Sequence, residues 1–228
     1  MTHHRRRNNG TDPSKINETV ELSPAQRYAA FKQTQAKQRT VAAEFARSMP
    51  FELDEFQMQA NDALEAGDNV LVAAPTGAGK TVAADFAIYL AQTRNVKAFY
   101  TTPIKALSNQ KYHDLVDQYG TDKVGLLTGD TSINSEADIV VMTTEVLRNM
   151  LYEHSVTLEA LRYVILDEVH YLADRFRGPV WEEVIIHLPK NVNIIGLSAT
   201  VSNVEDFSEW IESVRGKTTL VMSEQRPV

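Results

Sequence analysis

The chain has 228 residues, a length that suits one hydrophobic core with appendages, because folded domains average roughly 150 residues. Apolar residues make up 43% of the chain and charged residues 23%, which excludes a fibrous or wholly disordered protein. The net charge of −7 excludes a surface that is basic all over, so any nucleic acid must meet a local basic patch.

The sequence has no cysteine and no apolar run near the roughly 20 residues that cross a bilayer. Disulfides, thiolate metal sites and cysteine nucleophiles are therefore excluded, and any chemistry must use hydroxyls, carboxylates, lysine or histidine. The basic start MTHHRRRNNG is followed by polar residues instead of the apolar stretch of a signal peptide. We therefore expect a cytoplasmic location and no membrane partner.

The first elements are predicted to be a tail and two helices. Residues 1–20 follow neither hydrophobic period, so we expect a disordered tail. Ser23 to Gln26, SPAQ, signals a helix start, and we expect an N-terminal helix over residues 21–48 that lies along a larger body or a partner. A second helix should begin near Asp54, a good N-cap, and end at Gly67.

From Asn69 onward, short apolar runs alternate with helical stretches. Such runs are typical of strands that are buried on both faces, and the stretches between them are long enough for crossover helices. The pattern predicts an α/β fold, with a doubly wound and mainly parallel sheet, over residues 49–228. The predicted strands are NVLVAA, VKAFYTT, VGLLTGD, DIVVMTT, YVILDE, VNIIGLS and TTLVM.

Nearly all of these runs end in hydroxyl, glycine or acidic residues. In open parallel sheets, ligands bind beyond the carboxyl ends of the strands, so the polar chemistry is predicted at one edge of the sheet. The residues at these ends include Thr76, Thr101, Thr128, Thr143, Asp167 and Ser198.

The octet APTGAGKT follows the first predicted strand and opens the helix TVAADFAIYL. Gly77 and Gly79 let the backbone N–H groups gather, and the helix N-terminus adds positive potential, as a triphosphate requires. Lys80 would reach the β and γ phosphates, and Thr81 would hold Mg²⁺. A glycine-rich turn without a ligand is the alternative, and the flanking strand and helix count against it. The predicted ATP-binding loop is Pro75, Thr76, Gly77, Ala78, Gly79, Lys80 and Thr81.

The run YVILDEVH puts Asp167 and Glu168 at the end of a buried strand, where ionised carboxylates are costly without a cation. Asp167 would hold Mg²⁺ through water, and Glu168, beside the same ion, would orient and deprotonate the attacking water. An ordinary helix cap is the alternative. His170 is a catalytic candidate or a satisfied polar residue, and Ser198 and Thr200 of GLSAT could hydrogen-bond it or the acidic pair.

Together, APTGAGKT, DEVH and SAT resemble motifs I, II and III of a superfamily-two helicase, in that order. The resemblance covers most of residues 50–225. It implies a RecA-like motor domain, the first of two, that binds and hydrolyses ATP with Mg²⁺. Ala74 replaces the usual first glycine, as in the form used by helicases. The segment FELDEFQ looks like the adenine-reading Q motif, with Phe51 stacking on the base and Gln57 bonding its edge.

The segment DEVH followed by YLADRFRGPVWEEVIIHLP resembles the superkiller and Mtr branch of RNA helicases, which feed RNA to degradation or processing machines. A bacterial HelY-type member is the nearest relative that we expect. DEAD-box proteins differ, since they have alanine and aspartate after DE. The residues that carry this narrower resemblance are Arg177, Gly178, Trp181, Glu182 and Glu183.

The family resemblance also implies that three strand-end segments, TTPIKALSNQ, LLTGD and MTTEVLRNML, grip a nucleic-acid backbone. Phosphate contacts carry no sequence information, so we expect sequence-tolerant, salt-sensitive binding of single-stranded RNA. Without the resemblance these segments are ordinary caps and turns. A DNA motor, or a nucleotide-binding module that never hydrolyses ATP, stays open. The candidate residues are Lys105, Thr128, Gly129, Thr144 and Arg148.

After GLSAT the sequence offers a helix, VEDFSEWIESV, and the strand TTLVM. In this family, arginines from a second motor domain stabilise the transferring phosphoryl group, and they contribute about 10³ to 10⁵ in rate. We therefore expect this chain alone to bind Mg-ATP weakly and to hydrolyse it very slowly.

Overall fold

The computed structural model of the chain describes residues 39–170, 178–199 and 203–224. The chain divides into two compact units, residues 1–39 and 40–228, and every element described below belongs to the second. The predicted tail and most of the predicted N-terminal helix lie outside the described residues. In the described ranges no helix is long and apolar enough to cross a membrane.

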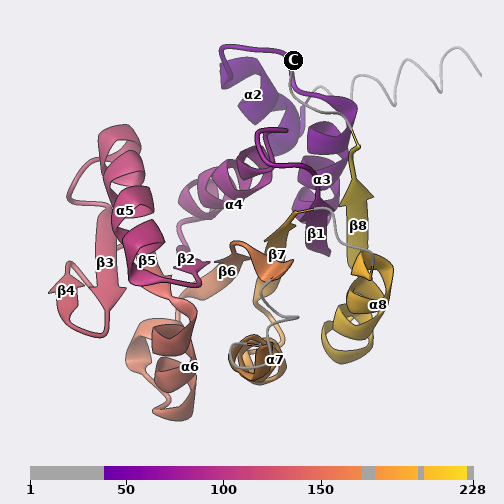
Figure 1. Cartoon of the computed structure of the whole chain (residues 1–228). Helices are drawn as coiled ribbons and strands as arrows, with labels where there is room; N and C mark the ends of the chain where they lie inside the picture. The colour runs from indigo at the N-terminus through magenta and orange to yellow at the C-terminus, as the bar shows by residue number, and fades with distance from the viewer. Residues whose placement is uncertain (1–38, 171–177, 200–202, 225–228) are drawn as a thin grey trace, which may run out of the picture. The chain divides into compact units, whose positions relative to one another are not determined.

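A single sheet of eight strands forms the centre of the second unit (Figure 1). The strands are β1 (Asn69–Ala73), β2 (Lys97–Thr102), β3 (Val124–Thr128), β4 (Thr131–Ile133), β5 (Ile139–Thr143), β6 (Leu161–Leu166), β7 (Asn193–Ser198) and β8 (Thr218–Met222). Their order is β4-β3-β5-β2-β6-β7-β1-β8. All neighbours pair in parallel except β3 and β4. Each predicted strand is confirmed, and β4 is an additional edge strand.

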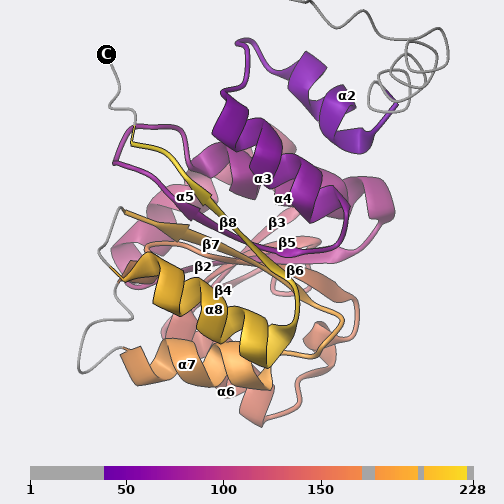
Figure 2. The same cartoon turned by 90° about the vertical axis from the view of Figure 1, so that its right-hand side faces the viewer.

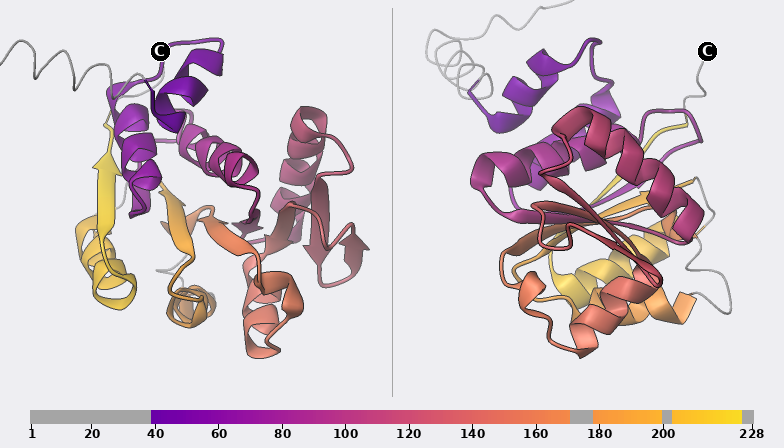
Figure 3. Two further views of the ribbon diagram at one scale, coloured as in Figure 1. Left: turned by 180° about the vertical axis from the view of Figure 1, so that it is seen from behind. Right: turned by 90° about the vertical axis from the view of Figure 1, so that its left-hand side faces the viewer.

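Helices cover both faces of the sheet, as Figure 2 shows from one side and Figure 3 from two others. The helices are α2 (Val41–Ser48), α3 (Glu55–Glu65), α4 (Thr81–Arg94), α5 (Lys105–Tyr119), α6 (Thr144–Tyr152), α7 (Gly178–His187) and α8 (Val204–Arg215). Helices α3, α4 and α5 cover one face, with α2 packed on α3 and α4. Helices α6, α7 and α8 cover the other. The predicted doubly wound α/β fold is confirmed.

Each central strand contributes side chains to two cores, because successive side chains point to opposite faces of a sheet. In β1, Val70 and Val72 pack in the core under α3 and α4, whereas Leu71 and Ala73 pack with Val204 of α8. All five residues of β1 are buried. Burial on both faces explains why the strands appear in the sequence as continuous apolar runs.

Helices α2 and α3 lead into the site. Asp54 is the N-cap of α3, as predicted, and it forms a capping box with Gln57. Within the described part of the predicted N-terminal helix, the backbone of Thr40 is extended and its hydroxyl accepts a hydrogen bond from the Ala43 N–H. Helix α2 therefore begins at Val41.

Candidate functional site

The predicted phosphate-binding loop connects β1 to α4. Gly77 and Gly79 have φ angles of 86° and 82°, in the left-handed region that side-chain-bearing residues rarely adopt. The N–H of Ala74 donates to the carbonyl of Ser198 at 3.2 Å, which fastens the start of the loop to the end of β7. The loop ends at Thr81, the exposed first residue of the 14-residue helix α4.

Two side chains hold this loop from opposite ends. The Lys80 ammonium group donates to the Ala74 carbonyl at 3.0 Å, so it reaches back across the loop. The Gln57 amide donates to the Gly79 carbonyl at 3.1 Å, and its oxygen accepts from the Asp54 N–H at 2.9 Å. An ammonium group, a helix N-terminus and a loop with two left-handed glycines fit a triphosphate.

The two Q-motif residues have different surroundings. The Phe51 side chain is 50% exposed, as stacking on a purine base requires. Gln57 is buried, and both ends of its amide are hydrogen-bonded to protein backbone. The structure thus places Gln57 against the phosphate-binding loop, a contact that the sequence analysis missed. Recognition of an adenine edge by Gln57 stays a prediction.

The acidic pair lies at the same edge of the sheet as the phosphate-binding loop. Asp167 and Glu168 follow β6 directly, and β7 is the only strand between β6 and β1. The parallel ends of β6 and β1 are therefore about 10 Å apart, two strand spacings. The sheet thus brings the predicted phosphate-binding loop and the acidic pair to one edge.

Both oxygens of the Asp167 carboxylate accept hydrogen bonds. The Tyr100 hydroxyl donates to Oδ2 at 2.8 Å, and the Glu168 N–H donates to Oδ1 at 2.9 Å. Burial, followed by the negative charge of Asp167, raises the pKa of Tyr100 well above its ordinary value. The Tyr100 hydroxyl therefore keeps its proton and stays a donor.

Glu168 is one of the few non-glycine residues with positive φ, at 56°. Such conformations are uncommon for residues with side chains and are concentrated at functional sites. Nδ1 of His170 lies 3.1 Å from Oε2 of Glu168, so the two candidate catalytic residues are adjacent. The Ser198 hydroxyl instead donates to the Ala199 carbonyl at 2.8 Å, and Thr200 lies outside the described residues.

The donor set suits Mg²⁺ bound together with a nucleotide. In residues 39–170, 178–199 and 203–224, no three histidine or acidic side chains converge as a protein-only metal site would require. Magnesium in nucleotide sites takes one or two carboxylates, with phosphate and water oxygens completing its shell. The Thr81 hydroxyl and the Asp167 carboxylate, with Glu168 beside them, can provide this smaller set.

Three of the nucleic-acid candidates converge around Asp130, which the sequence analysis missed. Lys105, the first residue of α5, pairs with Asp130 at 2.5 Å, and the Thr128 hydroxyl donates to the same carboxylate at 3.0 Å. Gly129 lies between Thr128 and Asp130 in the chain, in the exposed turn after β3. A hollow of about 440 Å³ is lined by Lys105, Gly129, Asp130, Thr143, Glu145, Val146 and Asn149.

The other two candidates have different partners. Thr144 is buried, and its hydroxyl donates to the Thr102 carbonyl at 3.3 Å. The Arg148 guanidinium group donates a hydrogen bond to Oδ1 of Asn149, and its Nε atom lies 3.8 Å from Oε2 of Glu183 of α7. The structure therefore gathers Lys105, Thr128 and Gly129 around Asp130, whereas Thr144 and Arg148 bond other partners. Their chain neighbours Thr143, Glu145 and Asn149 line the same hollow as Lys105 and Gly129.

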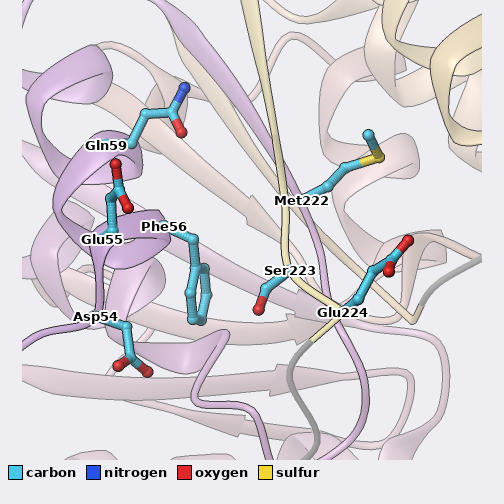
Figure 4. Close-up of a pocket in the computed structure, with 7 residues that line it drawn as sticks. All are labelled: Asp54, Glu55, Phe56, Gln59, Met222, Ser223 and Glu224. Atoms are coloured by element: carbon cyan, nitrogen blue, oxygen red, sulfur yellow. The ribbon is translucent and has the colours of Figure 1, made fainter. Parts of the chain in front are cut away.

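A second hollow, of about 290 Å³, lies between the first turn of α3 and the end of β8 (Figure 4). Its lining is acidic and contains none of the predicted ATP-binding residues, so it does not suit a triphosphate. The lining residues are Asp54, Glu55, Phe56, Gln59, Met222, Ser223 and Glu224.

Comparisons with known proteins find helicases. The family model described as DEAD/DEAH box helicase matches residues 54–207. The probable helicase HelY of Mycobacterium tuberculosis is 62% identical over 184 residues, which is 81% of this chain and 20% of that protein. The antiviral helicase SKI2 of Saccharomyces cerevisiae is 52% identical over 184 residues, 80% of this chain and 14% of that protein. This chain thus spans about a fifth or less of these relatives.

Solved structures show the same fold. The helicase Lhr of Mycobacterium smegmatis, bound to single-stranded DNA and AMP-PNP, matches 80% of this chain and 27% of that chain, with a TM-score of 0.65 and 29% identity. The range that the family model matches contains the phosphate-binding octet, the DEVH segment and GLSAT. On the family match and these relatives, the chain belongs to the DEAD/DEAH box helicases, in their Ski2-like DExH branch.

Proposed function

We propose that this chain is the first motor domain of an ATP-dependent RNA helicase. One observation carries the proposal. The phosphate-binding loop after β1 and the Asp167–Glu168 pair after β6 lie at one edge of the sheet, with a single strand between them. Phosphate-binding and acidic groups at this separation suit the two ends of a magnesium triphosphate.

Each residue of the site has a proposed task. Lys80 turns from the Ala74 carbonyl to the β and γ phosphates, Phe51 stacks on the base, and Thr81 and Asp167 hold the metal. Glu168 orients the attacking water and accepts its proton, while His170 holds the Glu168 carboxylate. Mg²⁺, when bound, neutralises charge that develops on the phosphate oxygens.

We propose that the nucleic acid lies along the carboxyl ends of β2 and β3, where Lys105, Thr128 and Gly129 meet. A phosphate group there would replace the Asp130 carboxylate as the partner of Lys105 and Thr128. RNA is favoured by the resemblance to the superkiller and Mtr branch, which also suggests RNA-degradation machinery as a partner. We further propose that a second RecA-like domain completes the motor. The complete motor is proposed to work in the cytoplasm.

A DNA motor is the second candidate, because the similar helicase Lhr was solved with single-stranded DNA. Single-stranded RNA and DNA of the same sequence separate the two candidates. The RNA proposal expects RNA to bind more tightly than DNA and to stimulate ATP turnover more strongly in a chain that includes a second motor domain. Equal or stronger stimulation by DNA would favour the second candidate.

Replacement of Lys80 by alanine tests the nucleotide site. We expect the affinity for Mg-AMP-PNP to fall by about 10- to 100-fold, because a charged hydrogen-bond donor to phosphate is lost. Lys190→Ala is the matched control, since the Lys190 ammonium group also donates to a backbone carbonyl, that of Val214. Calorimetry measures both affinities, and thermal unfolding checks folding. Equal affinities for Lys80→Ala, Lys190→Ala and the unchanged chain would refute the assignment.

A further inference from the structure

Tyr100 of β2 links the hydrophobic core to the acidic pair. Its side chain is fully buried in the core that α4 and α5 cover, yet its hydroxyl lies 2.8 Å from Oδ2 of Asp167. The parallel register pairs Tyr100 with Ile165, two residues before Asp167. The tyrosine ring therefore reaches along the face of the sheet toward the end of the neighbouring strand.

The ring of Tyr100 is itself held in place. The Lys111 ammonium group of α5 lies 4.9 Å from the ring centroid, a distance at which a cation is attracted to an aromatic face. Helix α5 begins at Lys105, one of the proposed nucleic-acid contacts. Tyr100 thus lies between the helix that carries a nucleic-acid candidate and the carboxylate proposed to hold the metal.

The terminal torsion of an aspartate is broad, so its carboxylate plane is fixed mainly by its hydrogen bonds. At Asp167 the Glu168 N–H fixes one oxygen, and the Tyr100 hydroxyl fixes the other. Groups that hydrogen-bond a metal-holding carboxylate in this way typically contribute about 10- to 100-fold to metal affinity or activity.

We propose that Tyr100 is a positioning residue of the ATPase site, whose hydroxyl orients the Asp167 carboxylate toward the metal-bound nucleotide. This inference rests on the proposed function, because it requires that Asp167 face a magnesium nucleotide. It predicts a defect that appears only when Mg²⁺ is present. A purely structural hydroxyl would change stability and leave the magnesium dependence of binding unchanged.

Tyr163 offers a matched control. It is also buried on the same face of the sheet, one strand away in β6, and its hydroxyl accepts a hydrogen bond from Arg94. Tyr100→Phe and Tyr163→Phe therefore each remove one hydroxyl from a buried, hydrogen-bonded tyrosine. Of these two tyrosines, Tyr100 is the one whose hydroxyl contacts the acidic pair.

The experiment measures AMP-PNP affinity for this chain with Mg²⁺ and with EDTA. For Tyr100→Phe we expect an affinity about tenfold weaker than that of the unchanged chain with Mg²⁺, and the same affinity with EDTA. Tyr163→Phe should match the unchanged chain in both conditions. An affinity of Tyr100→Phe equal to that of the unchanged chain in Mg²⁺ would overturn the proposal, as would equal losses in both variants.

A double-mutant cycle with Asp167→Asn separates positioning from loss of folding. If Tyr100 acts through Asp167, its replacement should cost little further affinity once Asp167 is changed. Additive losses would count against the proposal. Failure of the proposed function has a different signature, since the unchanged chain would then bind AMP-PNP no better with Mg²⁺ than with EDTA.

Discussion

Gly79 gives the phosphate-binding loop a shape that no other residue takes without strain. Its φ is +82°, and a Cβ atom there would lie 2.5 Å from Nε2 of Gln57. Gly79→Ala would therefore strain the backbone and displace the amide that holds the loop. We expect a loss of about 1–3 kcal/mol in the free energy of unfolding, together with weaker Mg-AMP-PNP binding. Chemical denaturation and calorimetry measure the two effects.

Gly120 provides the comparison for Gly79. Its φ is +89°, but a Cβ atom there meets nothing within 4 Å. Gly120→Ala should therefore cost about 1 kcal/mol of backbone strain and leave nucleotide binding unchanged. If both alanine variants lose the same stability and bind the nucleotide equally well, the contact between Gln57 and Gly79 contributes neither to stability nor to nucleotide binding.

At single residues, the sequence predicts only what a local pattern contains. Lys80 and Asp167 could be located because each stands in a short motif beside a predicted strand. The contact of the Tyr100 hydroxyl could not, because it depends on which strands are neighbours and in what register. The pairing of Asp130 with Lys105 could not either, because it depends on where the start of α5 lies relative to the end of β3. Tyr100 is one apolar residue among several in its run, so nothing local separates it from a core residue.

Among the elements, α8 is fixed to the turn between α7 and β7 by its last residue. The buried guanidinium group of Arg215 donates to the carbonyls of Leu188, Pro189 and Val192, where the chain turns from α7 into β7. Arg215→Met would leave these carbonyls without their charged donor. We expect a loss of about 2–4 kcal/mol in the free energy of unfolding, measured by chemical denaturation.

Arg162 shows what the loss of a less connected arginine should cost. Its guanidinium group donates to the carbonyl of Leu161, its own neighbour in β6, and it is only half-buried. Arg162→Met should lose less than about 1 kcal/mol. A loss for Arg215→Met no larger than this value would show that α8 is held by its apolar face alone.

Strands were predicted more completely than helix boundaries, for a physical reason. A strand that is buried on both faces needs an unbroken apolar run, which few other structures require. Helix α2 has no such constraint. Its start at Val41 is capped by the Thr40 hydroxyl and by the carboxylate of Glu65 of α3, which is distant in the sequence. The three-residue strand β4 exists because it follows β3 and pairs with it antiparallel, so its own sequence carries little information.

In the whole molecule, the order of the strands creates the site. Thr81, which ends the loop after β1, and Asp167, the first acid after β6, are 86 residues apart in sequence (167 − 81). They meet because both strands are parallel and only β7 separates them. The sequence predicts the parallel sheet and the polar ends of its strands, but it does not give the strand order, which follows from how the crossover helices pack.

Among the residues that the structure describes, the positive charge at this site lies on the side of the phosphate-binding loop. Lys80 and the N-terminus of α4 would face the β and γ phosphates, whereas the opposite side consists of the acids Asp167 and Glu168. A phosphoryl group in transfer also needs positive charge near its equatorial oxygens, which arginines of a second motor domain supply in related motors. We therefore expect this chain to turn over ATP about 10³ to 10⁵ times more slowly than a chain that includes a second motor domain. Phosphate release with saturating single-stranded RNA measures both rates, and Lys80→Ala in the longer chain sets the background; comparable rates in the two chains would mean that this domain hydrolyses ATP without a partner.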